Sequence, residues 1–178
     1  VLDHGGAHPP DARAMLANLG IGAARGRYLG FLDHDDVLLG GAHAHLVGRL
    51  RASGAAIAFG RTPAAPVVVN GPLLLAQGRR QPFTGRSVAE LFRANFAPLH
   101  SWLVDRARLP DGLLRMEPML TREEDYDLLL RLCAAVPADF GGIEREVGLY
   151  MQKSDGSNTL PLDGTGDDPE GPEAAARC

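Results

Sequence analysis

The sequence predicts an α/β fold, because short apolar runs alternate with segments whose apolar residues recur at helical spacing. A second observation is an apolar run that ends at Leu32 and is followed by Asp33, Asp35 and Asp36. Open α/β sheets bind ligands at the carboxyl edge of their strands, where these side chains are expected to lie. A length of 178 residues with 45% hydrophobic content is typical of one domain with a single core.

Each predicted element has a local signal along the chain. In order, we predict a helix over residues 11–24, a strand over 27–33, a helix over 37–53, a strand over 55–60, a hairpin with strands 67–69 and 73–75, a helix over 87–95, a strand over 102–104, a helix over 121–136 and a strand over 148–151. Residues 1–10 are expected to form a loop. Residues 154–178 are rich in Gly, Pro, Asp and Glu, so we predict a domain over residues 1–153 and a disordered tail.

Start and stop residues support the first two helices. Asp11 is the expected cap of the first helix, and its apolar side is formed by Met15, Leu16 and Leu19. Gly54 ends the second helix, because glycine is frequent just after a helix C-terminus. The apolar residues of that helix recur at helical spacing and are Leu38, Ala42, Leu46 and Leu50.

The remaining elements follow from turn residues and apolar runs. Asn70-Gly71 suits the primed turn of a two-residue hairpin between two apolar strands. Cys133 lies within an apolar helical run and is expected in the core. With Cys178 as the second cysteine, no disulfide framework is predicted, which fits a reducing compartment.

Asp33, Asp35 and Asp36, here called the first acidic segment, have two interpretations. Three nearby carboxylates repel one another unless a cation lies among them, and Mg²⁺ or Mn²⁺ suits oxygen ligands. Alternatively, Asp35 or Asp36 caps the helix predicted from residue 37, because acidic caps are common.

Glu123, Glu124 and Asp125, the second acidic segment, also have a structural interpretation. Thr121 and Glu124 fit a capping box, and acids in a first turn are favourable to the helix dipole. A helix start that fixes Glu124 would also hold Asp125 rigidly at the edge of a cleft, so both interpretations stay open.

Two stretches resemble family 2 glycosyltransferases. Residues 18–36 (NLGIGAARGRYLGFLDHDD) are similar to that family's Asn-x-Gly, Ala-x-Gly-x-Tyr and Phe-Leu-Asp-x-Asp-Asp pattern. Residues 123–132 (EEDYDLLLRL) resemble its Glu-Asp-Tyr-Asp-Leu-x-x-Arg segment. The two motifs occur in the family's order, about ninety residues apart, and are more specific together than alone. The resemblance covers roughly residues 10–155.

The resemblance implies a three-layer α/β/α domain of the GT-A type. It also implies inverting transfer of a sugar from a nucleotide-diphosphate donor to a hydroxyl acceptor, with Asp125 as the catalytic base. Asp35 is then the first choice for direct contact with Mn²⁺ or Mg²⁺, and Asp33 binds that metal or the donor ribose. Asn18 and Gly20 match the Asn-x-Gly that lies under the donor.

Further site residues are expected by the same resemblance. Glu124 and Asp36 are expected either to contact the acceptor or to support the ligand-binding residues from behind. His100 and Trp102 are expected to line the acceptor cleft. A core or rim position for Trp102 is the alternative. The family's Arg before the Asn is Ala17 here.

Two cationic positions complete the expected donor site. Arg13 or Arg25 can substitute for the family's missing Arg. Lys153 follows the last strand, where many relatives carry a His near the diphosphate, and either contacts phosphate or is a surface lysine.

The resemblance also defines what is expected to be missing and which rivals remain. Such enzymes begin with a strand, a helix and a strand ending in Asp-Asp-Gly-Ser that hold the nucleotide base. We expect this chain to lack that segment, so residues 1–153 are a partial domain. The rivals are a metal-dependent phosphoryl-transfer or phosphohydrolase domain that uses the same acids, and a non-catalytic fragment.

Composition limits the partners and the location. A formal net charge of −4 does not indicate nucleic-acid binding. We find no signal peptide, and the apolar region over residues 55–76 is too interrupted to span a bilayer. The expected location is cytoplasmic or peripheral to the inner face of a membrane. A glycan or lipid-linked acceptor, as in cell-envelope polysaccharide biosynthesis, is the expected partner.

Overall fold

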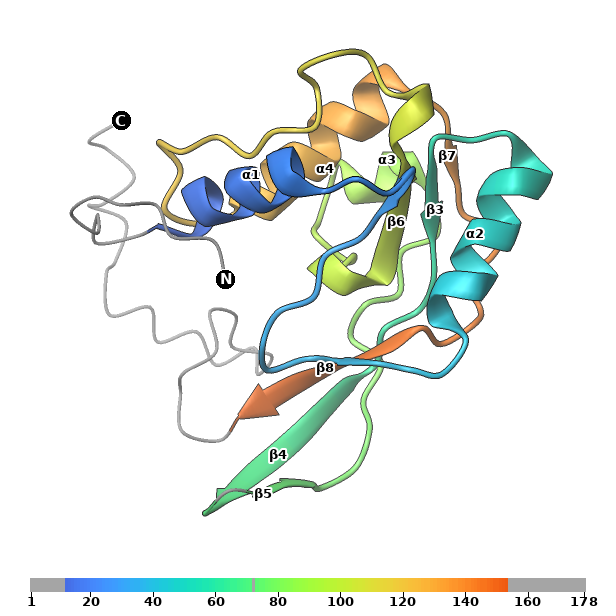
Figure 1. Cartoon of the computed structure of the whole chain (residues 1–178). Coiled ribbons are helices and arrows are strands. Elements are labelled where there is room, and N and C mark those ends of the chain that lie inside the picture. The colour runs from blue at the N-terminus through green and yellow to red at the C-terminus, as the bar shows by residue number, and fades with distance from the viewer. Residues whose placement is uncertain (1–11, 72, 154–178) are drawn as a thin grey trace.

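The computed structural model describes residues 12–71 and 73–153 (Figure 1). The helices are α1 (Arg13–Ala23), α2 (Ala42–Ser53), α3 (Val88–Leu91) and α4 (Glu124–Ala135), with 3-10 turns η1 (Leu99–Ser101) and η2 (Arg106–Arg108). The strands are β1 (Tyr28–Leu29), β2 (Val37–Leu38), β3 (Ile57–Phe59), β4 (Ala64–Asn70), β5 (Leu73–Ala76), β6 (Trp102–Asp105), β7 (Ala138–Asp139) and β8 (Gly148–Lys153).

The strands form two mixed four-stranded sheets. The first has the order β1-β6-β3-β7, in which β3 and β7 are parallel and the other pairs are antiparallel. The second has the order β2-β8-β4-β5, in which β4 and β8 are parallel. The chain is therefore a mixed α/β protein, as the alternation of elements predicts.

Helices pack against both faces of the first sheet, because successive strand side chains point to opposite faces. Ile57 and Phe59 of β3 share one apolar cluster with α4. Ala58, between them, belongs to a second cluster with α2. Figure 1 shows α1 and α4 on one side of β3 and β6, with α2 on the other.

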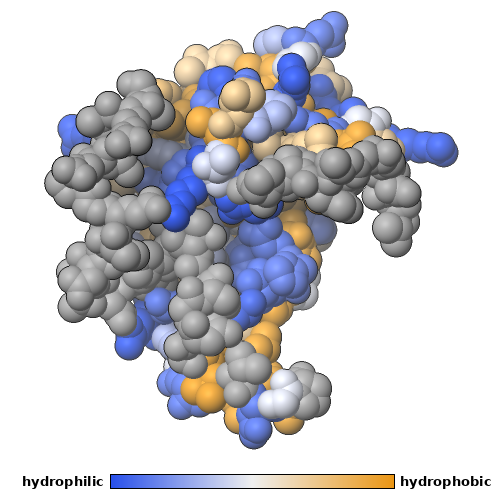
Figure 2. All heavy atoms as spheres, turned by 90° about the vertical axis from the view of Figure 1, so that its left-hand side faces the viewer, coloured by the Kyte–Doolittle hydropathy of each residue, from blue (hydrophilic) through white to orange (hydrophobic). Residues whose placement is uncertain are grey.

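The hairpin itself is confirmed, because β4 and β5 pair antiparallel. Its predicted Asn70-Gly71 turn is wrong, because Asn70 is the last residue of β4 and pairs with Leu73 without a positive φ. Gly71, which follows it, has a φ of 57° in the left-handed region that glycine tolerates. Figure 2 shows apolar residues gathered at the end of the molecule formed by this hairpin. The exposed apolar side chains there are Val68, Leu73, Leu74 and Leu75.

The helix predicted over residues 37–53 is only partly correct. Val37 and Leu38 form β2, because β8 offers them an antiparallel partner with Val37 opposite Leu149. The helix begins at Ala42, after Gly41 turns the chain with a φ of 81°. The interpretation of Asp35 or Asp36 as its cap is therefore wrong. The expected apolar face of α2 and its stop at Gly54 are confirmed.

The apolar face predicted for the first helix is also wrong. Ala14, Ala17 and Ile21 pack into the core, whereas Leu16 and Leu19 are 43% and 39% exposed. These three residues follow one another at spacings of three and four, so they form one side of α1 and the leucines lie outside it. The expected cap Asp11 lies outside the described residues, as do the loop 1–10 and the tail 154–178.

The capping box predicted for the third long helix is wrong as well. α4 begins at Glu124, and the residue before it, Glu123, has a φ of 58° and makes no side-chain cap. Thr121 supplies its backbone carbonyl to Arg13 instead. The buried side of α4 is formed by Leu128, Leu129, Leu132 and the expected core residue Cys133.

The remaining differences concern short elements. The strand predicted over residues 27–33 is limited to Tyr28–Leu29, and the helix over 87–95 to Val88–Leu91. Ser87 caps that short helix by accepting a hydrogen bond from the Glu90 amide. β7 was not predicted. Among the described residues, no helix has both the length and the apolar character needed to cross a membrane.

Candidate functional site

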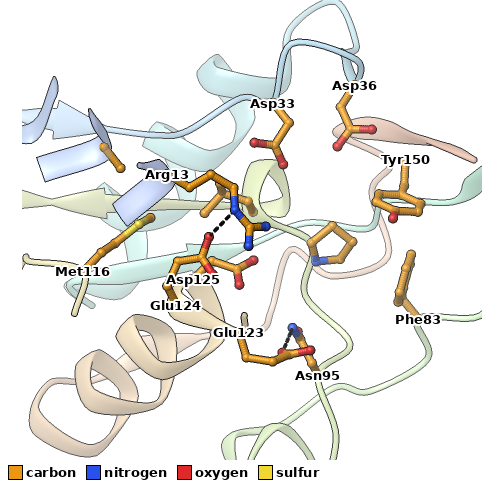
Figure 3. A pocket seen from close by; sticks show the side chains of 13 residues that line it. Arg13, Asp33, Asp36, Phe83, Asn95, Met116, Glu123, Glu124, Asp125 and Tyr150 are labelled. Carbon is orange, nitrogen blue, oxygen red and sulfur yellow. Dashed lines mark hydrogen bonds and ion pairs between the residues drawn. The ribbon is translucent and has the colours of Figure 1, made fainter. Parts of the chain in front are cut away.

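One cavity of about 270 Å³ brings the two acidic segments together (Figure 3). Its walls come from α1, the loop after β1, the loops around η1, the start of α4 and β8. The lining residues are Arg13, Ala17, Asp33, Asp36, Phe83, Asn95, Pro98, Leu99, Met116, Glu123, Glu124, Asp125 and Tyr150. Arg13 is the one lysine or arginine among these lining residues, against five carboxylates.

Asp36 is held by groups that stabilise its charge. The Met151 amide donates to its Oδ1 at 2.9 Å, and Nδ1 of His100 lies 3.0 Å from its Oδ2. The imidazole contact is short but is not aligned as a hydrogen bond. With a side chain only 4% exposed, Asp36 ties its loop to β8 and η1.

Asp35 has a cationic partner of its own. The ammonium of Lys153 donates a hydrogen bond to its Oδ2 at 3.0 Å. Partial burial alone raises the pKa of Asp35, but the hydrogen bond from Lys153 and the lysine's charge outweigh it and lower that pKa overall. Asp35 is therefore a charged carboxylate already paired within the chain.

Asp33 is the exposed member of the first acidic segment and lines the cavity. Its pKa is raised by partial loss of surrounding solvent, and then by the charges of Asp36 and Asp35. A cation near Asp33 would relieve that repulsion. His34, next in sequence, has a side chain that is 92% exposed.

Asp125 stands at the start of α4 in a very different environment. Burial raises its pKa to about 6, and the charges of Glu124 and Glu123 add to that effect against an opposing backbone hydrogen bond. That bond is donated by the Tyr126 amide to Asp125 Oδ1 at 2.8 Å. Asp125 is thus a carboxyl group that changes protonation close to neutral pH.

Glu124 links the helix start to α1. Its residue is 7% exposed, and its Oε1 lies 3.4 Å from Nε of Arg13. Its other oxygen, Oε2, is buried and has no hydrogen-bond partner among the described residues. Beside it, Glu123 accepts a weak hydrogen bond from Asn95 at 3.4 Å. Figure 3 shows Arg13 between Asp33 and these carboxylates.

α4 is anchored firmly below these acids. Leu128, Leu129 and Leu132 are each no more than 1% exposed. The Tyr126 hydroxyl donates to the Leu91 carbonyl, which ties the first turn to α3. The packing therefore fixes the direction in which the second acidic segment faces.

Other predicted site residues lie around or behind the cavity. Asn18 exchanges two hydrogen bonds of 2.8 Å with the Met116 backbone, so its amide holds a cavity-lining loop in place. Trp102 is 1% exposed, with its ring 5.4 Å from that of Phe31, so it belongs to the core and offers no surface to an acceptor. His100 is buried against Asp36. Gly20 lies on α1 with nothing within 4 Å of where a Cβ would be.

Several lining residues were not predicted from the sequence. Arg13, by contrast, is one of the two arginines expected to replace the family's missing Arg, and it lines the cavity. Phe83 and Tyr150 form an edge-to-face pair with centroids 5.9 Å apart and form part of its wall. Phe83 comes from a loop without a recognisable motif. Within residues 12–71 and 73–153, no group of three or more His, Cys, Asp or Glu side chains is arranged to hold a metal ion.

Comparisons with known proteins identify a fold. No family model and no curated protein sequence matches the chain. Among solved structures, it is similar to residues 1–349 of S. aureus TarS, a glycosyltransferase, with a TM-score of 0.54 and 11% sequence identity. The match covers 80% of this chain and 40% of that one, so the chain spans about two-fifths of its neighbour's length. The fold is therefore glycosyltransferase-like.

Proposed function

We propose that this chain is a family 2 glycosyltransferase domain of the GT-A type. In this proposal it transfers a sugar, with inversion, from a nucleotide-diphosphate donor to a hydroxyl acceptor. The observation that carries the proposal is that Asp33 and Asp125, from two motifs far apart in sequence, line one cavity in a glycosyltransferase-like fold. The phosphohydrolase rival gives the second acidic segment no role in that cavity.

Asp125 has the properties that a general base requires. An acceptor hydroxyl must lose its proton as it attacks, and a nearby carboxylate takes that proton in the transition state. A pKa of about 6 leaves Asp125 ionised at neutral pH and makes it a stronger base than an ordinary aspartate. The buried leucines of α4 hold the helix in the core and so keep the Asp125 carboxyl group in place.

The leaving diphosphate gains negative charge and must be stabilised on the other side of the sugar. Arg13 supplies one positive charge to the cavity, held by Glu124 and by the Thr121 carbonyl. This contact supports Arg13 in the place of the family's arginine. It also gives Glu124 a positioning role.

A divalent cation, Mn²⁺ or Mg²⁺, remains part of the proposal, with Asp33 and Asp35 as the residues that would hold it. Asp33 fits this role because its exposed carboxylate is repelled by two neighbours. Mg²⁺ sites often use one or two carboxylates together with substrate phosphates. When bound, the ion would neutralise charge on the diphosphate. Asp35 would hold the ion in competition with the ammonium of Lys153, which binds its Oδ2.

The acceptor and the location rest on the sequence resemblance alone. We propose a glycan or lipid-linked acceptor, used in cell-envelope polysaccharide biosynthesis at the cytoplasmic face of a membrane. His100 and Trp102, being buried, can support the cleft only from behind.

The test is a product assay with a panel of nucleotide-diphosphate sugars and glycan acceptors. We expect acceptor-dependent release of the nucleoside diphosphate and an inverted anomeric configuration in the product by NMR. Asp125→Asn should reduce the reaction by a factor of about 10² to 10⁴, whereas Asp127→Asn should not, because Asp127 pairs with Arg131 on the same helix. Release of phosphate from simple esters without an acceptor would favour the phosphohydrolase. Absence of both turnover and nucleotide binding would favour the non-catalytic fragment.

A further inference from the structure

Lys153 ends β8 in a position that the sheet defines. β8 runs between β2 and β4, and Lys153 is paired with Val67 in the parallel β4–β8 register. Its ammonium reaches Asp35, 118 positions earlier in the chain, at 3.0 Å. The two side chains are only 18% and 24% exposed. This contact is a partly buried ion pair between a fixed strand and the first acidic segment.

The charge on Lys153 limits what it can do at this site. A lysine ammonium has three donors and no acceptor, so it cannot be a metal ligand. An ammonium and a divalent cation at the same carboxylate also repel each other, and that repulsion is stronger where solvent is partly excluded. Metal binding at Asp35 is therefore weakened as long as Lys153 stays at this carboxylate.

The neighbouring acid offers no alternative ligand. Asp36 is occupied by the Met151 amide and by His100, and its side chain is 4% exposed. Asp33 is the remaining acid of the segment, and a single carboxylate is a weak protein contribution to a divalent site. The state of Asp35 consequently decides how well this segment binds a metal.

We propose that Lys153 is an internal counter-cation of Asp35 that competes with a divalent cation for this carboxylate. The inference rests on the proposed function, because it concerns the metal assigned to Asp33 and Asp35. Lys153 keeps the metal-free segment balanced in charge and weakens its affinity for Mn²⁺. Asp35 thus binds the ion only when the ion competes successfully with the ammonium of Lys153.

The test measures Mn²⁺ binding to the full 178-residue chain, with the free ion followed by electron paramagnetic resonance. Lys153→Met removes the competing charge and keeps a long side chain, so it should bind Mn²⁺ at least about tenfold more tightly than wild type. Lys153→Arg keeps the charge and should bind as wild type does. The double variant Asp35→Asn/Lys153→Met should lose the gain, because the competition acts through Asp35.

A second measurement uses thermal unfolding without and with Mn²⁺. Without the ion, Lys153→Met should melt below wild type, and saturating Mn²⁺ should raise its melting temperature more than that of wild type. Lys153→Gln serves if circular dichroism shows that Lys153→Met does not fold. Equal or weaker Mn²⁺ binding in both neutral variants, or no Mn²⁺ binding by any variant, would overturn the competition.

Failure of this inference is distinguishable from failure of the proposed function. Sugar transfer with Mn²⁺ affinity unchanged by Lys153→Met would overturn the competition and leave glycosyl transfer standing. Tighter Mn²⁺ binding by that variant without any sugar transfer would support the competition and count against the transferase.

Discussion

The two acidic segments carry the same formal charge, but the surroundings of Asp35 in the first and of Asp125 in the second are opposite. In the first acidic segment, Asp35 pairs with Lys153 and Asp36 with His100 and a backbone amide. In the second, Asp125 is buried beside two further carboxylates, and Arg13 forms an ion pair with Glu124. The pKa of Asp35 is consequently lowered, whereas that of Asp125 is raised to about 6.

This difference shows that charge alone does not define what an acidic motif does. Carboxylates with cationic partners stay ionised and are suited to holding charge near a ligand. A buried carboxylate beside like charges exchanges a proton near neutral pH and is suited to base catalysis. On this account, the first acidic segment serves the donor and the second serves the acceptor.

The largest effect is expected from removing the proposed base. Asp125→Asn should reduce sugar transfer by a factor of about 10² to 10⁴, because an amide cannot accept the proton. Donor binding, measured by calorimetry with the nucleoside diphosphate, should change little. Near-normal turnover in Asp125→Asn would show that the second acidic segment does not supply the base.

A large loss of stability is expected when a buried leucine of α4, the helix that begins with the second acidic segment, is shortened. Leu129 is 1% exposed, so Leu129→Ala should lower the free energy of unfolding by about 2 to 5 kcal/mol in urea titrations. Leu120→Ala is the control, because Leu120 is 37% exposed and should matter far less. A loss in Leu129→Ala no larger than in this control would mean that α4 is not anchored in the core.

The raised pKa of Asp125 has a consequence for stability. Its folded pKa, about 6, lies above the ordinary value of 3.8, so protonation favours the folded state. Its contribution is fully present below about pH 4 and is lost as the pH rises through about 6. Relative to Asp125→Asn, wild type should therefore lose about 2 to 3 kcal/mol between these limits in denaturant titrations. A difference that is independent of pH would contradict the raised pKa.

A smaller effect is expected from the neighbour of Asp125. Glu124→Gln removes one like charge and releases Arg13 from its partner, so the pKa of Asp125 should fall. The rise of transfer activity with pH should then move by about half to one unit towards acid. Glu117→Gln provides a matched control, because Glu117 is exposed and does not line the cavity. A shift in the opposite direction would rule out repulsion by Glu124.

The sequence predicted those parts of the fold that depend on local patterns. The β4–β5 hairpin, the apolar face of α2 and the buried leucines of α4 are all encoded within a few residues. The errors arose where distant segments meet. β8 pairs with Val37 and converts the expected start of a helix into β2, and Arg13 takes the Thr121 carbonyl beside the expected capping box.

The same distinction applies to the candidate site. The motifs marked both acidic segments, and the structure places them at one cavity. The partner of each carboxylate could not be read from the sequence, because Lys153, His100 and Arg13 approach from other elements. Lys153 lowers the pKa of Asp35, whereas burial raises that of Asp125, and this contrast supports the proposed division of roles.

The most direct test of this division is a ¹³C NMR titration of the aspartate side-chain carboxyl groups, with Asp125→Asn and Asp35→Asn used to assign the resonances. The account predicts that Asp125 titrates near pH 6 and Asp35 below its ordinary value of 3.8. If both carboxyl groups titrated together near pH 4, the two acidic segments would be electrostatically equivalent, and the assignment of Asp125 as base would lose its physical basis.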